Sequence, residues 1–111
     1  MPKQKIILKG IPASAGIAKG KVKIILDPSE NSKMKKGDIL VTEMTNPLFL
    51  PAIQRAKAII TDVGGLLCHA AIVSRELGIP CVVGTKRATK ILKDNQKIKV
   101  DGEKGTIYQD N

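Results

Sequence analysis

The sequence predicts a single α/β domain with mixed sheets over residues 1–111. Three observations lead to this fold class. The chain is 111 residues long, and single domains usually contain ~100–150 residues. Predicted strands alternate with predicted helices through the middle of the chain. Both ends of the chain, in contrast, are rich in strands alone.

The first part of the chain is predicted to contain strands and loops but no helix. Within residues 5–8, Ile6, Ile7 and Leu8 form a short apolar run, and the glycines and the proline of residues 10–20 exclude a helix after it. Residues 21–26 begin with alternating Lys and apolar side chains, which predicts a strand. The polar segment 27–38 is predicted to be a loop, and residues 39–43 to be the next strand.

The second part is predicted to alternate helices and strands. Asn46 is a candidate helix N-cap with Pro47 at the first helical position, although Pro51 must then lie in the first turn or kink the helix. The other predicted elements are a buried strand at 58–61, a helix at 69–77 ended by Gly78 and Pro80, a strand at 81–83, a short helix at 88–92 and a hairpin with strands around 98–100 and 106–108.

Composition restricts the core, the compartment and the cofactors. Aromatic residues make up 2% of the chain although 42% of it is hydrophobic, so the core must be built from Ile, Val, Leu and Ala. No run reaches the ~18–20 apolar residues of a membrane helix or the ~7–15 of a signal-peptide core. We therefore expect a cytoplasmic protein without a membrane partner, with Cys68 and Cys81 as free thiols. With a single histidine in the chain, we expect no metal site.

The net charge of +9 first indicates a nucleic acid or an acidic membrane surface as partner. The surplus lies at the two ends, because residues 1–40 hold nine Lys against three acids and residues 86–111 hold seven Lys and Arg against four. Residues 41–85 hold three of each sign. Proteins that bind single strands stack bases on aromatic side chains, so nucleic acid is not the expected partner. The basic ends are predicted to be a solvated surface or a docking face for an acidic partner domain.

Residues 61–84 carry the functional signal and are predicted to form strand, Gly-Gly loop, helix, turn and strand. His69, the single histidine, begins the helix directly after Gly64 and Gly65. The first N–H groups of a helix lack partners, the helix dipole is positive there, and glycine lets a bulky group approach the backbone. The imidazolium form should be disfavoured at this end, which leaves a neutral ring able to attack a phosphoryl group. The geometry therefore suits a phosphohistidine.

Each of these residues also has a plainer interpretation. A lone histidine at a helix N-terminus is more often a surface or capping residue than a catalyst. A glycine pair often does no more than turn a strand into a helix, and Cys68 is most often an inert small side chain. From spacing alone, phosphohistidine is the minority interpretation.

A resemblance to a known family changes that balance. GGLLCHAAIVSRELGIPCVVG, residues 64–84, resembles the phosphohistidine signature of the phosphoenolpyruvate-utilising enzymes, which include phosphoenolpyruvate synthase, pyruvate phosphate dikinase and enzyme I of the sugar phosphotransferase system. GIPASAGIAKGKV is similar to the opening of the family's mobile domain, GDILVTEMTNPLFLPAIQRAKAIITDVGG to the approach to its histidine, and KDNQKIKVDGEKGTIY to its closing hairpin. The resemblance is collinear over nearly the whole chain.

The resemblance implies a swivelling β/β/α phosphohistidine domain that carries a phosphoryl group between two active sites. His69 matches the phosphorylated histidine, and Arg75 and Glu76 match an Arg-Glu pair that we expect to be structural. The residues expected to support the phosphate are Gly64, Gly65, Cys68 and Ala70. The family commonly has Thr two residues before the histidine, where this chain has Leu67 preceded by Leu66, so regulation by phosphorylation at that position is not expected.

The resemblance also implies partners. The chain has no P-loop, no acidic cluster for Mg²⁺ and no room for the family's nucleotide-binding and phosphoenolpyruvate/pyruvate-binding domains. The chain is either a stand-alone protein that works with separate partners or an excised domain; in the first case we expect those domains on separate chains, with phosphoenolpyruvate or ATP as donor and pyruvate among the acceptors. The chain is then a phosphotransferase component that binds no cofactor itself, with Mg²⁺ at the partners' active sites. The alternative is a non-catalytic interaction or regulatory module, for which Leu66, Leu67 and the missing domains are the motive.

Overall fold

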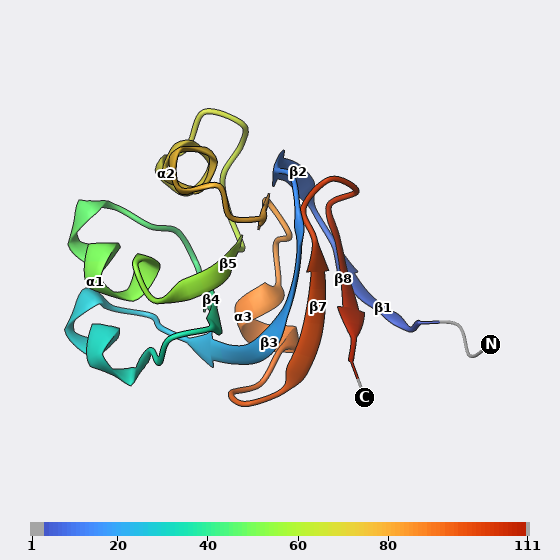
Figure 1. Cartoon of the computed structure of the whole chain (residues 1–111), viewed down its shortest axis with the longest axis horizontal. Coiled ribbons are helices and arrows are strands. Elements are labelled where there is room, and N and C mark those ends of the chain that lie inside the picture. Colours follow the sequence, from blue (N-terminus) through green and yellow to red (C-terminus); the bar gives the residue numbers. More distant parts are fainter. Residues whose placement is uncertain (1–3, 111) are drawn as a thin grey trace.

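A computed structural model describes residues 4–110 and confirms the α/β fold, built around one mixed sheet of eight strands (Figure 1). The sheet order is β1-β8-β7-β3-β4-β5-β6-β2. The strands are β1 (Ile6–Lys9), β2 (Ile11–Ser14), β3 (Ile17–Ile24), β4 (Asp38–Thr42), β5 (Ala56–Thr61), β6 (Cys81–Val83), β7 (Lys97–Asp101) and β8 (Thr106–Gln109). The helices are α1 (Leu50–Ile53), α2 (His69–Leu77) and α3 (Ala88–Ile91), with the 3-10 helices η1 (Pro28–Lys33) and η2 (Pro47–Phe49).

The two edges of the sheet belong to one continuous stretch of chain. β1 and β2 are separated by Gly10 alone, yet β1 pairs with β8 while β2 pairs with β6 at the other edge. The Gly10 N–H donates to the Gly105 carbonyl at 2.8 Å, next to the bend. The sheet is therefore curled until its edges meet in one bent segment, which leaves little unpaired strand edge exposed.

The central strands β3, β4, β5 and β6 run parallel in sequence order. Parallel neighbours need crossover connections, and right-handed crossovers made in one direction across a sheet place their helices on one face. Figure 1 accordingly shows α1 and α2 on one side of β4 and β5, with β7 and β8 on the other. Helix α3 lies in the connection from β6 to β7. It packs against β4 and β5 from the face opposite to α1 and α2.

Alternation along the parallel strands divides the core into two clusters. Ile39 and Val41 of β4 belong to one cluster, whereas Leu40 between them belongs to the other. All five residues of β4 are buried, as expected for a parallel strand covered on both faces. One cluster lies under α1 and α2 and includes Met34, Leu40, Phe49, Ile53, Ile59 and Cys81. The other lies inside the curled sheet and includes Val22, Val41, Ile60, Val82, Ile98 and Ile107.

Several predicted elements are confirmed at the predicted residues. Helix 69–77 and strand 81–83 have the predicted bounds, and Gly78 ends the helix in the left-handed conformation. The C-terminal hairpin also forms. The prediction of a plain loop at 27–38 was wrong, because Asp27 accepts a hydrogen bond from the Ser29 N–H at 2.8 Å and Pro28 suits the first turn of η1.

Other predictions were wrong in their bounds or missed an element. The strand predicted at 21–26 is β3, which begins earlier and ends at Ile24. Asn46 caps as predicted, but Pro51 splits the expected helix into η2 and α1. Strand β2 was not predicted, because Pro12 and the nearby glycines are typical of a loop. An edge strand tolerates a proline, and Pro12 sits opposite Val82 at the edge of this sheet.

The closure of the sheet predicts a strong effect of Gly105→Ala. Gly105 has a φ of 69°, and an added Cβ would overlap the Gly10 carbonyl and lie 3.0 Å from Pro12. We expect the free energy of unfolding to fall by more than about 2 kcal/mol, measured by urea denaturation. Gly65→Ala is the matched control, because an added Cβ there meets no atom within 4 Å. Equal stability of the two variants would contradict this account.

Candidate functional site

His69 is half-buried at the first position of α2, at the end of the loop that follows β5. It lines a cavity of about 260 Å³, which we call the His69 cavity. The full lining is Met44, Thr45, Thr61, Val63, Gly64, Cys68, His69 and Ala70. Four of the residues predicted from the sequence, Gly64, Cys68, His69 and Ala70, are thus brought together, whereas Gly65 lies outside the lining.

The N-terminus of α2 lacks a side-chain cap. Cys68 occupies the N-cap position without a side-chain hydrogen bond, and the first turn contains no acidic residue. The helical ladder starts with the Ile72 N–H, which donates to the Cys68 carbonyl at 3.0 Å. The N–H groups before Ile72 are those that a helix leaves without an internal partner, and the helix dipole makes this end positive. This end of α2 therefore favours an anion beside the His69 ring.

Thr45 holds the His69 ring and was missed by the sequence analysis. Its hydroxyl lies 2.8 Å from His69 Nδ1, and the residue is 5% exposed. The sequence placed Thr45 only at the start of a predicted helix. One signal was available, because Thr45 follows the strand before the one that leads to His69, and the carboxyl ends of parallel strands lie at the same edge of a sheet.

The register between β4 and β5 places Thr45 beside the loop of His69. Thr42 is paired with Thr61 at the ends of the two strands. The pairing continues beyond them, because the Asp62 N–H donates to the Thr42 carbonyl at 3.1 Å and the Val63 N–H to the Glu43 carbonyl at 3.0 Å. The segments that follow β4 and β5 are therefore held together up to the residues that line the His69 cavity.

The two predicted loop glycines have different structural roles. Gly64 has a φ of 130°, and a Cβ on it would lie 2.8 Å from the Cys68 Sγ. A side chain at Gly64 would therefore displace Cys68, the residue before the histidine. Gly65 is not constrained by contact, and its carbonyl accepts a hydrogen bond from the Cys68 N–H at 3.1 Å. A part for either glycine in phosphate binding stays a prediction.

Leu66 and Leu67 lie in this turn, and both side chains are exposed, Leu67 by 85%. Arg75 ties the turn to the edge of the sheet, since its guanidinium donates to the Leu66 carbonyl at 2.6 Å and to the Ala13 carbonyl at 2.8 Å. These bonds fit the structural part expected of Arg75. Val63 and Met44, which line the His69 cavity, are exposed as well, whereas the two leucines lie outside its lining.

The two cysteines differ in environment. Cys81 is fully buried, and burial raises the pKa of its thiol to about 12. Cys68 is half-buried and lines the His69 cavity. Within residues 4–110, no three His, Cys, Asp or Glu side chains gather as metal ligands. No helix in that range is long and apolar enough to cross a membrane.

Comparisons with known proteins place these features in a family. Residues 34–105 match the model of the family described as PEP-utilising enzyme, mobile domain. The chain is 64% identical over 105 residues to a probable phosphoenolpyruvate synthase of Archaeoglobus fulgidus. The matched region covers 95% of this chain but 14% of that relative. It is 61% identical over 105 residues to phosphoenolpyruvate synthase of Pyrococcus furiosus, and this match covers 95% of the chain and 13% of the relative.

A solved structure shows the same fold. The solution structure of Enzyme I (nEIt) matches with a TM-score of 0.62 and 27% identity, over 73% of this chain and 34% of that one. Compared with the two phosphoenolpyruvate synthases, the chain spans about one seventh of the relatives' length.

The cysteine environments predict selective alkylation. At pH 8, iodoacetamide should modify Cys68 in the folded protein and leave Cys81 intact, because a buried thiol with a pKa of about 12 forms almost no thiolate. Mass spectrometry should find one adduct without denaturant and two in denaturant. A Cys68→Ser variant should then take up none while folded. Modification of Cys81 before Cys68 would contradict the structure.

Proposed function

The chain belongs to the PEP-utilising enzyme mobile-domain family, and from this premise we propose that it is a phosphoryl carrier whose His69 is transiently phosphorylated. The observation that supports the proposal most is the hydrogen bond between His69 Nδ1 and the buried Thr45 hydroxyl, 2.8 Å apart. That bond occupies one ring nitrogen inside the fold and leaves Nε2 as the nitrogen for chemistry.

The step proposed is an attack by Nε2 on the phosphorus of a donor. A bond forms between Nε2 and phosphorus, and the bond between phosphorus and the donor's leaving oxygen breaks, with the electron pair going to that oxygen. Nε2 has a free lone pair when the ring proton lies on Nδ1. In that tautomer Nδ1–H donates to the Thr45 hydroxyl oxygen, which orients the ring and stabilises the positive charge that develops on it.

The uncapped N-terminus of α2 supports the product of this step. The phosphoryl group on Nε2 carries negative charge, and the helix end beside it offers unpartnered N–H groups and a positive dipole. Ala70 and Ala71 follow His69 and are buried, so no large side chain of the first turn covers the helix end. Onward transfer stays possible, because an acceptor can approach the phosphoryl group from the open side of the cavity.

The names of the relatives support a place in phosphoenolpyruvate chemistry. We propose phosphoenolpyruvate or ATP as the donor and pyruvate among the acceptors, each bound by nucleotide-binding or phosphoenolpyruvate/pyruvate-binding domains on other chains. Mg²⁺, which neutralises phosphoryl oxygens, would be held at those partner sites. The chain would then act as a phosphotransferase component in the cytoplasm.

A second candidate is an interaction or regulatory module that has lost phosphoryl transfer. Leu67 favours it, since this side chain is 85% exposed close to His69 and has no hydroxyl to contact a phosphate. The two candidates differ in whether His69 ever carries a phosphoryl group.

Labelling decides between them. The chain is incubated with the Archaeoglobus fulgidus relative, whose own matching histidine has been replaced, and with phosphoenolpyruvate or ATP labelled in the transferred phosphate. We expect label on this chain that is lost in acid and stable in base, and a phosphorus NMR shift of an Nε2-phosphohistidine. His69→Ala is the control and should stay unlabelled. Label on His69→Ala, or none on the folded chain with either donor, would reject the carrier.

Thr45 should set the rate of labelling. We expect Thr45→Val to slow phosphorylation about tenfold, the effect of losing ~1.4 kcal/mol of transition-state stabilisation from one hydrogen bond. Thr45→Ser keeps the hydroxyl and should label within about threefold of the original rate. The initial rate of ³²P incorporation measures both. A Thr45→Val variant that is folded and as fast as Thr45→Ser would remove Thr45 from the mechanism.

A further inference from the structure

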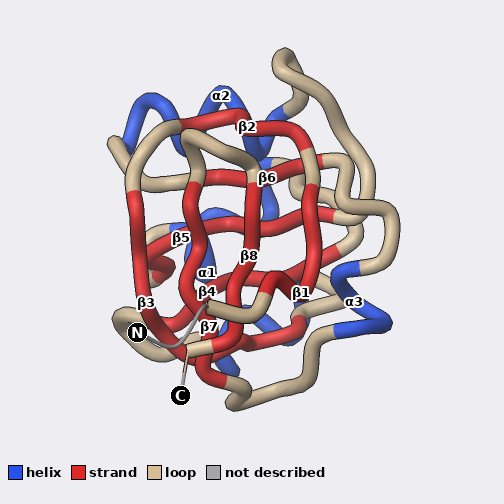
Figure 2. The backbone as a smooth tube through the Cα atoms, turned by 90° about the vertical axis from the view of Figure 1, so that its right-hand side faces the viewer, coloured by secondary structure: helices blue, strands red, loops and turns tan. Residues whose placement is uncertain are grey.

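The outward face of β3 and β7 presents four lysines in two facing pairs. In this antiparallel pair, Lys19 stands opposite Lys99 and Lys21 opposite Lys97. The residues between them, Gly20 and Ile98, face inward, and Ile98 is fully buried in the core of the curled sheet. We call the outward set, Lys19, Lys21, Lys97 and Lys99, the lysine face. Figure 2 looks onto this side of the molecule, away from α1 and α2.

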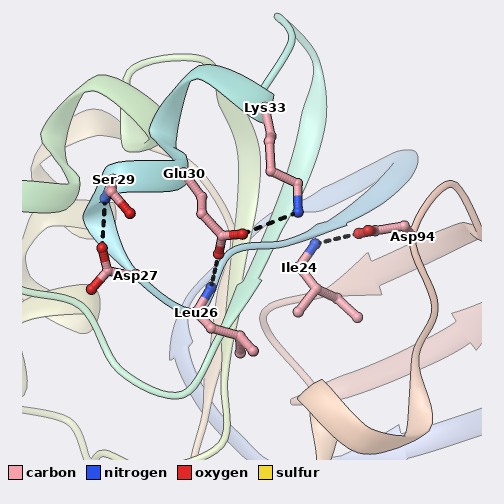
Figure 3. Close-up of polar contacts among 7 residues, drawn as sticks. All are labelled: Ile24, Leu26, Asp27, Ser29, Glu30, Lys33 and Asp94. Carbon is pink, nitrogen blue, oxygen red and sulfur yellow. Dashed lines mark hydrogen bonds and ion pairs between the residues drawn. The ribbon is translucent and has the colours of Figure 1, made fainter.

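Most acidic side chains have their hydrogen bonds elsewhere in the fold and not with these lysines. Six of the ten acidic side chains accept hydrogen bonds from backbone N–H groups, and Figure 3 shows Asp27, Glu30 and Asp94 doing so. The other three are Asp38, Asp62 and Asp101. Among residues 4–110, two ion pairs form, and one of them, Lys19 with Asp110 at 4.0 Å, touches the lysine face. Most Lys and Arg side chains in this range are therefore outside ion pairs.

The arrangement opposes folding rather than serving it. Like charges directly opposite on antiparallel strands are destabilising, and this face has two such pairs in succession. Lys99 finds partial compensation, since it contacts Gln4 and its Nζ lies 4.8 Å from the centre of the Tyr108 ring. Lys21 and Lys97 form no ion pair within the described chain. The two line a hollow of about 280 Å³ together with Lys19, Gly20 and Asp110, so the charges converge on one place.

We propose that the lysine face is a docking surface for a carboxylate-rich surface of a partner protein. The two lysine pairs are two residues apart along each strand, or about 7 Å, which suits carboxylates set about one helical turn apart. A nucleic acid fits less well. The aromatic ring on this face, Tyr108, is covered by Lys99, and Asp110 beside the hollow opposes a dense row of phosphates.

The position of the lysine face separates docking from the chemistry of His69. Figure 1 shows α2, which begins with His69, on the opposite side of the molecule from β7. A partner bound at the lysine face therefore leaves the His69 cavity open. The inference does not depend on phosphorylation of His69, and its test uses the unphosphorylated chain.

The test compares two variants with the same change in charge. The β3–β7 variant, Lys97→Glu with Lys99→Glu, turns both facing pairs into Lys–Glu pairs. The α3 variant, Lys90→Glu with Lys93→Glu, changes exposed lysines in and just after α3. The probe is fluorescent poly-L-glutamate at ~0.1 M salt, with single-stranded DNA of equal charge in a parallel titration. We expect the β3–β7 variant to weaken poly-L-glutamate binding about tenfold or more and the α3 variant less than about threefold.

Two further readouts keep the result clear. Amide NMR shifts on adding poly-L-glutamate should concentrate in β3 and β7. The Tm of the β3–β7 variant should equal or exceed that of the original chain, because attraction replaces repulsion across both pairs. Equal weakening by the two double variants would mean that the charge acts diffusely and would overturn the proposal. Tighter binding of DNA than of poly-L-glutamate at the lysine face would overturn it in favour of a nucleic acid.

Discussion

The parallel pairing of β4 with β5 is the constraint on which the candidate site depends. It sets Thr42 opposite Thr61, and the pairing continues through Glu43 and Val63, past the ends of both strands. The loops that follow must then run side by side, and they supply Thr45 and the start of α2. A slip of one residue would turn every side chain of a strand to the opposite face. Because both faces of β4 are buried in separate clusters, such a slip would require both clusters to repack.

The same parallel strands explain how a small domain holds the geometry of the His69 cavity without a large aromatic core. Successive residues of β4, β5 and β6 belong to two different clusters, so each strand contributes to both. One cluster supports α1 and α2, and therefore His69. The other fills the curled sheet, whose edges are joined through the bend at Gly10. Apart from Phe49, the buried members of both clusters are aliphatic or sulfur-containing side chains.

The two sides of the molecule have different chemistry. The His69 cavity of about 260 Å³ is lined by no Asp, Glu, Lys or Arg, and two of its lining residues, Met44 and Val63, are exposed apolar side chains. The outward face of β3 and β7 is strongly basic because strand register places Lys19 opposite Lys99 and Lys21 opposite Lys97. The positive end of the α2 dipole therefore lies beside a cavity whose lining holds no Asp, Glu, Lys or Arg. The basic face can attract a partner without altering that environment.

The sequence by itself determined the family, the α/β class, the helix that begins at His69 and the C-terminal hairpin. These are local or motif-borne features: Gly-Gly before His69, Gly78 after the helix, and alternation or turn residues in the strands. It did not reveal β2, which looks like a loop because of Pro12 and becomes a strand only against β6. Nor did it reveal the contact between Thr45 and His69 or the facing lysines, because strand register brings together residues far apart in the chain. The strand β2, the Thr45–His69 contact and the facing lysines all depend on the pairing of distant strands, which no local pattern encodes.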